Sequence, residues 1–239
     1  MLIWQRTLPP HRRGGRLVAA EYTGRAANSG RIGPSIEAGI MDTQSWDDMY
    51  RSRDQVFSGE PNGVLVTEVT DLPPGQALDV GCGEGADALW LARRGWQVTA
   101  VDISRVALER AAAAGTDVAG RVAWNQGDLT STPPPAGAFD LVSAQYFPFP
   151  RDRYAGLRAL LAAVAPGGTL LIGSHNPADL APSPDHHFDP SAYYHPADIA
   201  GLLDDSWTVL VNETRPRTMP APPGTRHVTD TVLRARRLR

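Results

Sequence analysis

The sequence predicts an α/β fold built on a doubly wound, mostly parallel sheet, and three observations support this prediction. Short apolar segments alternate with amphipathic ones from about residue 76 onward, as in βαβ units whose sheet is buried on both faces. A glycine-rich turn at 81–85 joins the first apolar segment to the first amphipathic one. The length of 239 residues suits one such domain, and 42% hydrophobic with 21% charged residues is ordinary for a globular protein.

Residues 1–41 differ in composition from the rest of the chain. They are rich in Gly, Arg and Ser and show no sustained period of 2 or 3.6. Six arginines against Glu21 and Glu37 make the first 40 residues basic, whereas the remainder is acidic. We expect a flexible N-terminal extension at 1–41, although organelle transit peptides share this composition. The folded domain is expected at 42–239.

Two helices are expected before the sheet. The segment "TQSWDDMYRSRD" places Trp46, Met49 and Tyr50 on one side of a short helix. The segment "GVLVTEVTDL" is predicted to form a second helix, which ends at the turn 73–75.

The alternating segments supply the sheet and its covering helices. Strands are predicted at 77–80, 97–101, 122–125, 140–144 and 169–173, and helices at 86–94, 104–114 and 153–165. Ser104 is expected to cap the second of these helices. The strand-like segments 207–213 and 227–234 are close in sequence and joined by a Pro-rich loop, which favours antiparallel pairing.

Composition excludes several function classes. The chain has no lysine, so a Schiff-base lysine, a P-loop lysine and a Tyr-x-x-x-Lys pair are impossible. The single cysteine, Cys82, permits no intramolecular disulfide and suits a reducing cytoplasm. An acidic body is a poor binder of nucleic acid. No apolar run approaches the ~20 residues that would span a bilayer, so no membrane partner is expected.

The glycine turn predicts a ligand site, because ligands of doubly wound sheets bind at the carboxyl ends of strands. Glycines allow positive φ and a close approach to the backbone. Asp102 ends the next strand, 21 positions after Gly81, where a carboxylate can accept hydrogen bonds from ribose hydroxyls. Gly81-x-Gly83-x-x-Ala86 also fits a relaxed dinucleotide fingerprint.

Two carboxylates help to choose between these ligands. Asp79 before the turn and Glu84 within it would repel a pyrophosphate, whereas they suit a ligand with cationic groups and no phosphate. The pattern therefore favours an aminoacyl nucleoside. An NAD(P)-dependent oxidoreductase and a non-catalytic cofactor-binding protein stay open as alternatives. Cys82 is expected to be a small turn residue whose pKa is raised by the neighbouring carboxylates of Asp79 and Glu84.

Five motifs follow in order along the chain: "LDVGCGEG", "VTAVDIS", "NQGDL", "FDLVSAQYF" and "VAPGGTLLIGSHN". With them, the chain from about 46 to 236 resembles the class I S-adenosylmethionine-dependent methyltransferases. The resemblance implies a Rossmann-like sheet of seven strands, mostly parallel with the last strand antiparallel. It also implies that S-adenosyl-L-methionine is the cofactor.

The resemblance assigns roles to individual positions. It implies that the methionine moiety is contacted by Asp79 and by the backbone of Gly81, Cys82, Gly83 and Gly85. For the nucleoside it implies Asp102 at the ribose, Ile103 packed on adenine, Asp128 accepting from the adenine amino group, and the Leu129 N–H as a donor. Gln145 would lie beside the transferable methyl group.

The segment "SWDDMYRSRDQVFSGEPN" resembles small single-domain methyltransferases related to the tellurite-resistance and thiopurine enzymes. Many of these methylate thiols, chalcogen oxyanions or small xenobiotics. The resemblance implies that Trp46 and Tyr50 cover the cofactor and form part of the acceptor pocket. We therefore expect methyl transfer to a small molecule. In order of preference, the expected acceptor atom belongs to a thiol or other soft nucleophile, is an oxygen, or is a nitrogen.

Residues after the fourth and fifth strands are candidates for catalysis. Tyr146, Phe147 and Phe149 would line a pocket that sheds water, or else pack in the core. A thiol needs little help because part of it is thiolate near neutrality, whereas an alcohol or phenol needs a general base. His175 is the candidate base; the alternative is a hydrogen-bonded histidine at a strand end.

Lid elements are expected at about 43–62 and 177–196, the second contributing His186, His187, Tyr194 and His195 to the acceptor pocket. His186, His187, Asp189 and His195 would also suit a transition metal. Adjacent histidines often point apart, however, and no ligand spacing repeats, so no metal is predicted. Arg215 and Arg217 are expected at the surface, or as receivers of an anionic acceptor. The protein is expected to be a cytoplasmic monomer or weak homodimer.

Overall fold

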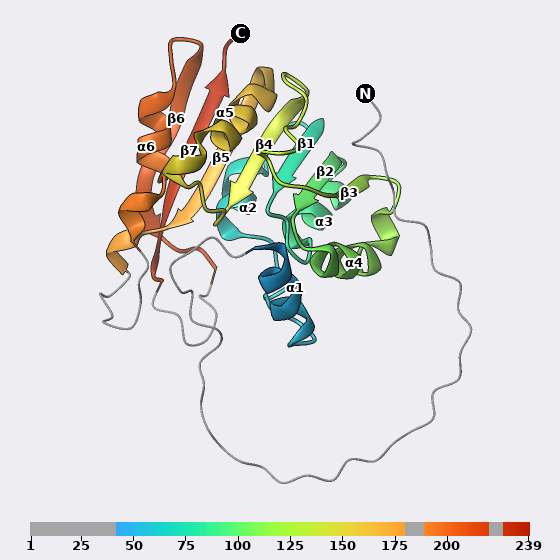
Figure 1. Ribbon diagram of the computed structural model, residues 1–239. Coiled ribbons are helices and arrows are strands. Elements are labelled where there is room, and N and C mark those ends of the chain that lie inside the picture. The colour runs from blue at the N-terminus through green and yellow to red at the C-terminus, as the bar shows by residue number, and fades with distance from the viewer. Residues whose placement is uncertain (1–41, 180–188, 220–226) are drawn as a thin grey trace, which may run out of the picture.

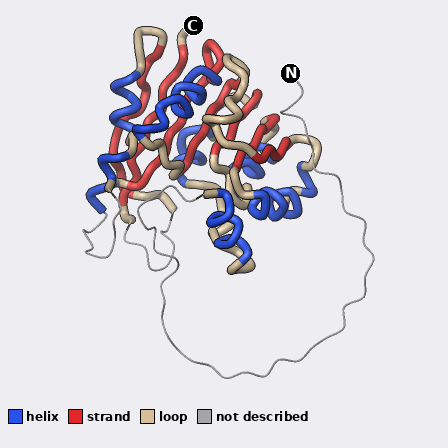
Figure 2. The backbone as a smooth tube through the Cα atoms, viewed as in Figure 1, coloured by secondary structure: helices blue, strands red, loops and turns tan. Residues whose placement is uncertain are grey.

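One mixed sheet organises the part of the chain that the computed structural model describes, residues 42–179, 189–219 and 227–239. Its strand order is β3-β2-β1-β4-β5-β7-β6, and helices cover both faces (Figures 1 and 2). The predicted extension at 1–41 lies outside the described residues.

The strands are β1 (Gln76–Val80), β2 (Gln97–Asp102), β3 (Val122–Gln126), β4 (Phe139–Gln145), β5 (Val164–His175), β6 (Trp207–Pro216) and β7 (Thr229–Arg237). β1 to β5 pair in parallel, and β7 runs antiparallel to both β5 and β6. The α/β fold with an antiparallel last strand is therefore confirmed. Most residues of β1 and β4 are buried, because helices cover both faces of these central strands.

The helices of the described chain are α1 (Thr43–Arg51), α2 (Gly63–Val69), α3 (Ala86–Arg93), α4 (Arg105–Ala114), α5 (Tyr154–Ala163) and α6 (Pro196–Leu202). The Ser104 hydroxyl accepts from the Ala107 N–H at 3.1 Å, which confirms it as the N-cap of α4. The short α6 was not predicted. It is too brief to show a period, yet Pro196 begins it and Ile199 is fully buried.

Two apolar clusters hold the helices to the sheet. On one face, Leu157 and Leu160 of α5 and Ile199 of α6 pack against β4, β5 and β7. On the other face, residues of α2 and α3, among them Leu65 and Leu91, pack against β1, β2 and β4. The strands are thus fixed from both sides, which positions their ends.

The carboxyl ends of β1, β2, β4 and β5 meet at one edge of the sheet, and α1 lies across this edge (Figure 1). The glycine turn, Asp102, Gln145 and His175 lie at these ends, whereas Asp128 follows β3 and Trp46 precedes the sheet. Among the described residues, no helix is both long and apolar enough to cross a membrane.

Candidate active site

The glycine turn between β1 and α3 adopts the left-handed backbone that the sequence predicts. Gly81, Gly83 and Gly85 have φ values of 70°, 51° and 85°. A Cβ at Gly85 would lie 2.7 Å from the Trp124 ring, so the turn also needs glycine for space. The turn therefore lies tightly against β2 and β3 and exposes its backbone at the sheet edge.

Asp102 is held by this turn. Its carboxylate accepts from the Gly83 N–H and the Ser104 N–H, both at 2.8 Å. Burial raises the pKa of Asp102, while these backbone donors oppose the rise. Two donors fix the orientation of a half-buried carboxylate and leave it lone pairs for further hydroxyl donors.

Asp79 ends up almost fully buried, with 2% of its surface exposed. One of its carboxylate oxygens has no hydrogen-bond partner in the described part of the chain. Burial, followed by the neighbouring carboxylates of Asp87 and Asp102, raises the pKa of Asp79 well above its ordinary value. A buried, unpaired acidic oxygen fits a ligand that brings an ammonium group.

Cys82 is a turn residue whose thiol stays protonated. Burial raises its pKa most, followed by the charges of Asp102 and Asp79. The direction was predicted, but the role given to Glu84 was wrong. Arg110 neutralises Glu84 at 2.9 Å.

Glu84 was expected to face the ligand, and the structure corrects this. Its carboxylate accepts from the backbone N–H groups of Val56 and Phe57, at 3.1 and 3.0 Å, in addition to its ion pair with Arg110. Glu84 therefore anchors the segment after α1. Its charge is no argument against a pyrophosphate, and that argument rests on Asp79 alone.

α1 lies over the glycine turn through Tyr50. The Tyr50 side chain is buried, and a Cβ at Gly83 would lie 3.0 Å from its hydroxyl oxygen. The ring centroids of Trp46 and Phe57 lie 6.0 and 6.2 Å from that of Tyr50. Tyr50 therefore lies beside the turn and Trp46 lies beside Tyr50, whereas their role as a cover of the cofactor stays a prediction.

Two side chains that the sequence analysis missed tie α1 down. The Asp47 carboxylate accepts from the Ser104 hydroxyl at 2.6 Å. Arg110 of α4 donates to the carbonyl oxygens of Tyr50 and Arg53, both at 2.6 Å. Each contact joins residues 57 or 60 positions apart, so no local pattern announces it.

The residues expected at the nucleoside end come from the ends of β2 and β3. Ile103 is half-buried, and its carbonyl accepts from Gln126 at 3.0 Å. One Asp128 oxygen accepts from the N–H and the hydroxyl of Thr130, both at 2.6 Å. The Leu129 side chain is buried in the core. Their roles toward adenine stay predictions.

The residues after β4 divide between site and core. Gln145 is buried against Gly173 of β5, and its side-chain amide oxygen has no partner in the described chain. A Cβ at Gly81 would lie 2.6 Å from the Phe147 ring, which places Phe147 on the glycine turn. Phe149 is 4% exposed and belongs to the core cluster. The pocket role considered for Phe149 is therefore wrong.

Tyr146 connects this region to β5 and β7. Its φ of 55° is unusual for a residue with a side chain. Its hydroxyl donates to Asp230 at 2.9 Å, and its ring centroid lies 4.4 Å from that of His175. Burial, followed by His227 and Arg217, lowers the pKa of His175 to about 3. His175 is therefore neutral near neutral pH, and its imidazole is a weak base.

Tyr194 and His195 are placed on the opposite face of the sheet from α2. The Tyr194 N–H donates to the Phe149 carbonyl at 2.8 Å, and the His195 N–H donates to Asp198 of α6 at 2.9 Å. His186 and His187 lie outside the described residues. Within residues 42–179, 189–219 and 227–239, no three His, Cys, Asp or Glu side chains are grouped to hold a metal.

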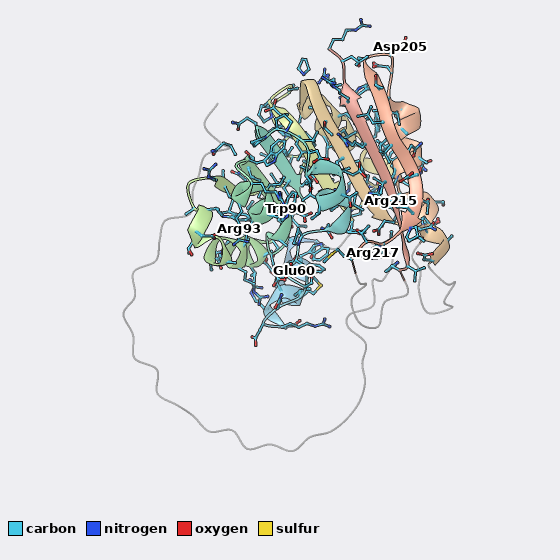
Figure 3. All side chains as sticks on the ribbon, turned by 180° about the vertical axis from the view of Figure 1, so that it is seen from behind. Glu60, Trp90, Arg93, Asp205, Arg215 and Arg217 are labelled. Atoms are coloured by element: carbon cyan, nitrogen blue, oxygen red, sulfur yellow. The ribbon has the colours of Figure 1, made fainter. Side chains whose placement is uncertain are left out.

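Arg215 and Arg217 are less exposed than expected, with 22% and 12% of their side-chain surface accessible. Arg215 pairs with Glu68 at 2.7 Å, and Arg217 pairs with Asp230 at 3.0 Å. Both arginines lie at the same end of β6 (Figure 3). The expectation of two surface arginines is therefore wrong.

Comparisons with known proteins agree with this geometry. Residues 77–168 match the family model described as a methyltransferase domain. Ajmaline N-methyltransferase of Rauvolfia serpentina is 35% identical over 114 residues, 46% of this chain and 39% of the relative. Ubiquinone biosynthesis O-methyltransferase of Xanthomonas campestris is 31% identical over 152 residues, 55% of this chain and 62% of the relative. The chain thus spans less than two thirds of these relatives.

Solved structures share the fold over more of the chain. One described by the conversion of a disulfide bond into a thioacetal group during echinomycin biosynthesis is 26% identical, with a TM-score of 0.64 over 82% of this chain and 91% of that one. The N-methyltransferase NodS of Bradyrhizobium japonicum with S-adenosyl-L-homocysteine is 18% identical, with a TM-score of 0.62 over 82% and 98%. The [4+2]-cyclase SpnF is 17% identical, with a TM-score of 0.58 over 85% and 99%.

The last two likenesses concern the fold alone. The glycine turn, the oriented Asp102 and the unpaired Asp79 oxygen also fit a nucleoside that carries an ammonium group, as S-adenosylmethionine does. Residues 77–168 therefore resemble a methyltransferase domain, and the described chain has the Rossmann-like fold of the solved N-methyltransferase NodS.

Proposed function

We propose that the protein transfers a methyl group from S-adenosylmethionine to a small-molecule acceptor, most readily a thiol or another soft nucleophile, by in-line displacement. The observation that carries the proposal is the pairing of an oriented carboxylate, Asp102, with a buried, unpaired one, Asp79, across the glycine turn. A ligand with vicinal hydroxyls and an ammonium group satisfies both.

The chain's own residues would bind and orient the cofactor. Asp102 would accept from the ribose hydroxyls, and Asp79 would receive the ammonium group. Ile103, Asp128 and the Leu129 N–H would form the adenine end. The cover at 43–62 would exclude water through Tyr50, which already lies on Gly83.

When bound, the cofactor supplies an electrophilic methyl group. Holding the acceptor in line with it can supply ~7–11 kcal/mol of the barrier. An anionic acceptor loses charge on the way to the transition state, so a pocket that sheds water favours the reaction. Tyr146 and Phe147 are half-buried aromatic side chains at the adjacent end of β4 and suit this role, beside Gln145.

The acceptor order follows from the weakness of His175 as a base. An imidazole with a pKa of about 3 removes little of the proton from an alcohol or phenol. A thiol arrives partly ionised and needs no such help. The neighbour whose description names a disulfide and a thioacetal, at 26% identity, further supports a sulfur acceptor.

Oxygen and nitrogen acceptors form the alternative, since ubiquinone biosynthesis O-methyltransferase and ajmaline N-methyltransferase are among the relatives. An oxidoreductase is disfavoured by Asp79 and by the absence of lysine from the sequence. A non-catalytic cofactor-binding protein, or an enzyme for another reaction, is a further alternative, because one fold can host many functions. Membership of the tellurite-resistance and thiopurine branch also stays a proposal. So do a cytoplasmic location, a monomeric or weakly dimeric state, and the lack of nucleic-acid or membrane partners.

The proposal is tested by formation of S-adenosylhomocysteine with panels of thiols, phenols and amines. Turnover is expected first with thiols, and Asp102→Ala should weaken cofactor binding about tenfold or more by removing two hydrogen bonds. Asp71→Asn, at an exposed acid outside the site, is the control. Unchanged affinity in Asp102→Ala would mean that the ribose assignment is wrong, and turnover with phenols or amines alone would overturn the acceptor order.

A further inference from the structure

A stack of three rings lies at the carboxyl end of the sheet, next to the predicted methyl-transfer region. The ring centroids of Tyr146 and His175 are 4.4 Å apart, and those of His175 and His227 are 3.8 Å apart with an interplanar angle of 16°. Tyr146 follows β4, His175 ends β5, and His227 precedes β7. Three separate parts of the chain thus build one feature.

Arg217 and Asp230 support the stack. The Arg217 guanidinium carbon lies 5.2 Å from the centre of the Tyr146 ring. One Asp230 oxygen accepts both from the Tyr146 hydroxyl at 2.9 Å and from an Arg217 terminal nitrogen at 3.0 Å. This Asp230 oxygen therefore accepts two hydrogen bonds, whereas Arg217 keeps further N–H groups.

Three buried nitrogen atoms around the stack have no partner. Nδ1 of His175, Nδ1 of His227 and Nε of Arg217 make no hydrogen bond within the described chain. Leaving buried polar atoms unpaired is unfavourable, because each has given up its hydrogen bonds to water. Three such atoms in one cluster indicate a place prepared for an oxygen-bearing group.

The chemistry of the cluster narrows the class of ligand. The described residues do not bring a third metal-ligating side chain to the two histidines. Burial and the neighbouring positive charges lower the pKa values of both imidazoles, so they serve poorly as proton acceptors. Each neutral imidazole carries one N–H, and in the tautomer with the hydrogen on Nδ1 it donates from that atom, as the Arg217 Nε–H does; a group of such donors binds an anion.

We propose that His175, His227 and Arg217 form an acceptor subsite that binds a carboxylate of the methyl acceptor, so that the acceptor is a small thiol acid. That the bound molecule is a methyl acceptor rests on the proposed function. That the cluster binds a carboxylate does not. Tyr146 and Phe147 are consecutive, and Phe147 lies on Gly81. Consecutive residues after β4 therefore reach the stack and the glycine turn, and they directly follow Gln145, beside which the methyl group is proposed to lie.

Charges around the stack predict how binding depends on pH. Asp230 faces it from β7, and Asp179 lies nearby with its carboxylate engaged by the N–H groups of Val228 and Thr229. Both acids are already paired. Burial and Arg217 lower the pKa values of the two imidazoles, whereas a bound carboxylate would raise them. Because the pKa of His175 is about 3 and that of His227 is lowered as well, both imidazoles are neutral between pH 7 and pH 8, so carboxylate binding is expected to be the same at these two pH values.

The test uses calorimetry on the full chain saturated with S-adenosylhomocysteine. The probes are 3-mercaptopropionate, its neutral amide, and butanoate, which keeps the carboxylate and lacks the thiol. Both carboxylates are expected to bind about tenfold or more tightly than the amide, with the same preference at pH 7 and at pH 8. Arg217→Gln should abolish this preference, and His227→Gln, at the half-buried end of the stack, should reduce it.

Arg215→Gln is the matched control, because Arg215 lies two positions away on the same strand end and pairs with Glu68 instead. It should keep the preference for carboxylates. Equal binding of amide and carboxylate, binding of neither, or equal losses in Arg217→Gln and Arg215→Gln would overturn the proposal.

Methyl transfer separates this proposal from the proposed function. Carboxylates that bind with the expected preference while no thiol is methylated would leave the subsite intact and refute the thiol acceptor. Equal methylation of acid and amide would refute the subsite and leave the proposed function intact.

Discussion

Asp79 lies at the end of β1, two positions before the glycine turn, with one oxygen unpaired among the described residues. Its pKa is raised by burial, so the charged form is costly in the folded chain. The unfolded carboxyl has its ordinary pKa near 3.8. Stability is therefore lost as the pH rises from about 4 through the higher folded value.

Asp79→Asn removes this cost and the charge that we assign to the ammonium group. The variant is expected to be more stable to denaturant than the parent at pH 8, because it carries no buried carboxylate charge. It should also bind S-adenosylmethionine about tenfold or more weakly. Denaturant unfolding and calorimetry measure the two effects, with Asp71→Asn as control. A variant that is less stable and binds the cofactor normally would contradict both assignments.

His175 predicts the opposite dependence on pH. Its folded pKa of about 3 lies below the ordinary 6.5, so the unfolded chain binds more protons between these values. Stability is therefore lost as the pH falls below 6.5. At pH 5 the loss from this residue is about 2 kcal/mol.

His175→Gln should abolish that part of the loss. The unfolding free energy of the parent should fall by about 2 kcal/mol more than that of the variant between pH 7.5 and pH 5. Other groups titrate in both proteins, so the difference between them isolates His175. Parallel pH profiles would show that the imidazole is freely protonated in the fold.

At the scale of elements, α1 is held over the glycine turn by α4. Arg110 joins Glu84 to the carbonyl oxygens of Tyr50 and Arg53, near the end of α1 where a cation is favourable. The contacts are partly buried and shared, so their loss affects the whole cover.

Arg110→Gln is expected to release α1 and weaken cofactor affinity about tenfold. Hydrogen exchange over 43–57 should rise in the variant, and calorimetry gives the affinity. Arg105→Gln is the matched control, because Arg105 lies on the same helix and forms an exposed ion pair with Glu109 at 3.1 Å. Unchanged protection of 43–57 would show that Arg110 does not hold the cover.

Elements with a strong local signal were predictable from the sequence. β1, β2, α3 and α4 follow clear apolar periods, and the cap Ser104 marks its helix start. β5 begins at Val164 instead of 169, because Phe139 pairs with Val164 and the strand continues through Pro166 to Gly168. A Pro-Gly-Gly run indicates a turn locally, and only the pairing with β4 overrides it.

At the scale of the whole molecule, the sequence predicted the sheet and one half of the site. The glycine turn and Asp102 are close in the chain, and their meeting follows from one βαβ unit. The cluster of Arg217, His227 and Asp230 with Tyr146 depends on the register of β6, β7 and β5. That register is set by contacts of high sequence separation, so the sequence placed Arg217 at the surface and overlooked His227 as a partner.

The whole fold also leaves two ligand classes in competition, since a glycine turn at a parallel sheet edge binds dinucleotides as well. With Glu84 neutralised by Arg110, the unpaired Asp79 carries the choice of a cationic, phosphate-free ligand. The central claim is therefore that the glycine turn binds S-adenosylmethionine and not a dinucleotide.

Calorimetric titration of the full chain with S-adenosylmethionine, S-adenosylhomocysteine and NAD(P) tests this claim most directly. We predict micromolar binding of the first two and no binding of NAD(P). Binding of NAD(P) without S-adenosylmethionine would return the glycine turn to a dinucleotide and remove the basis for the roles given to Asp79, Asp102 and the acceptor subsite.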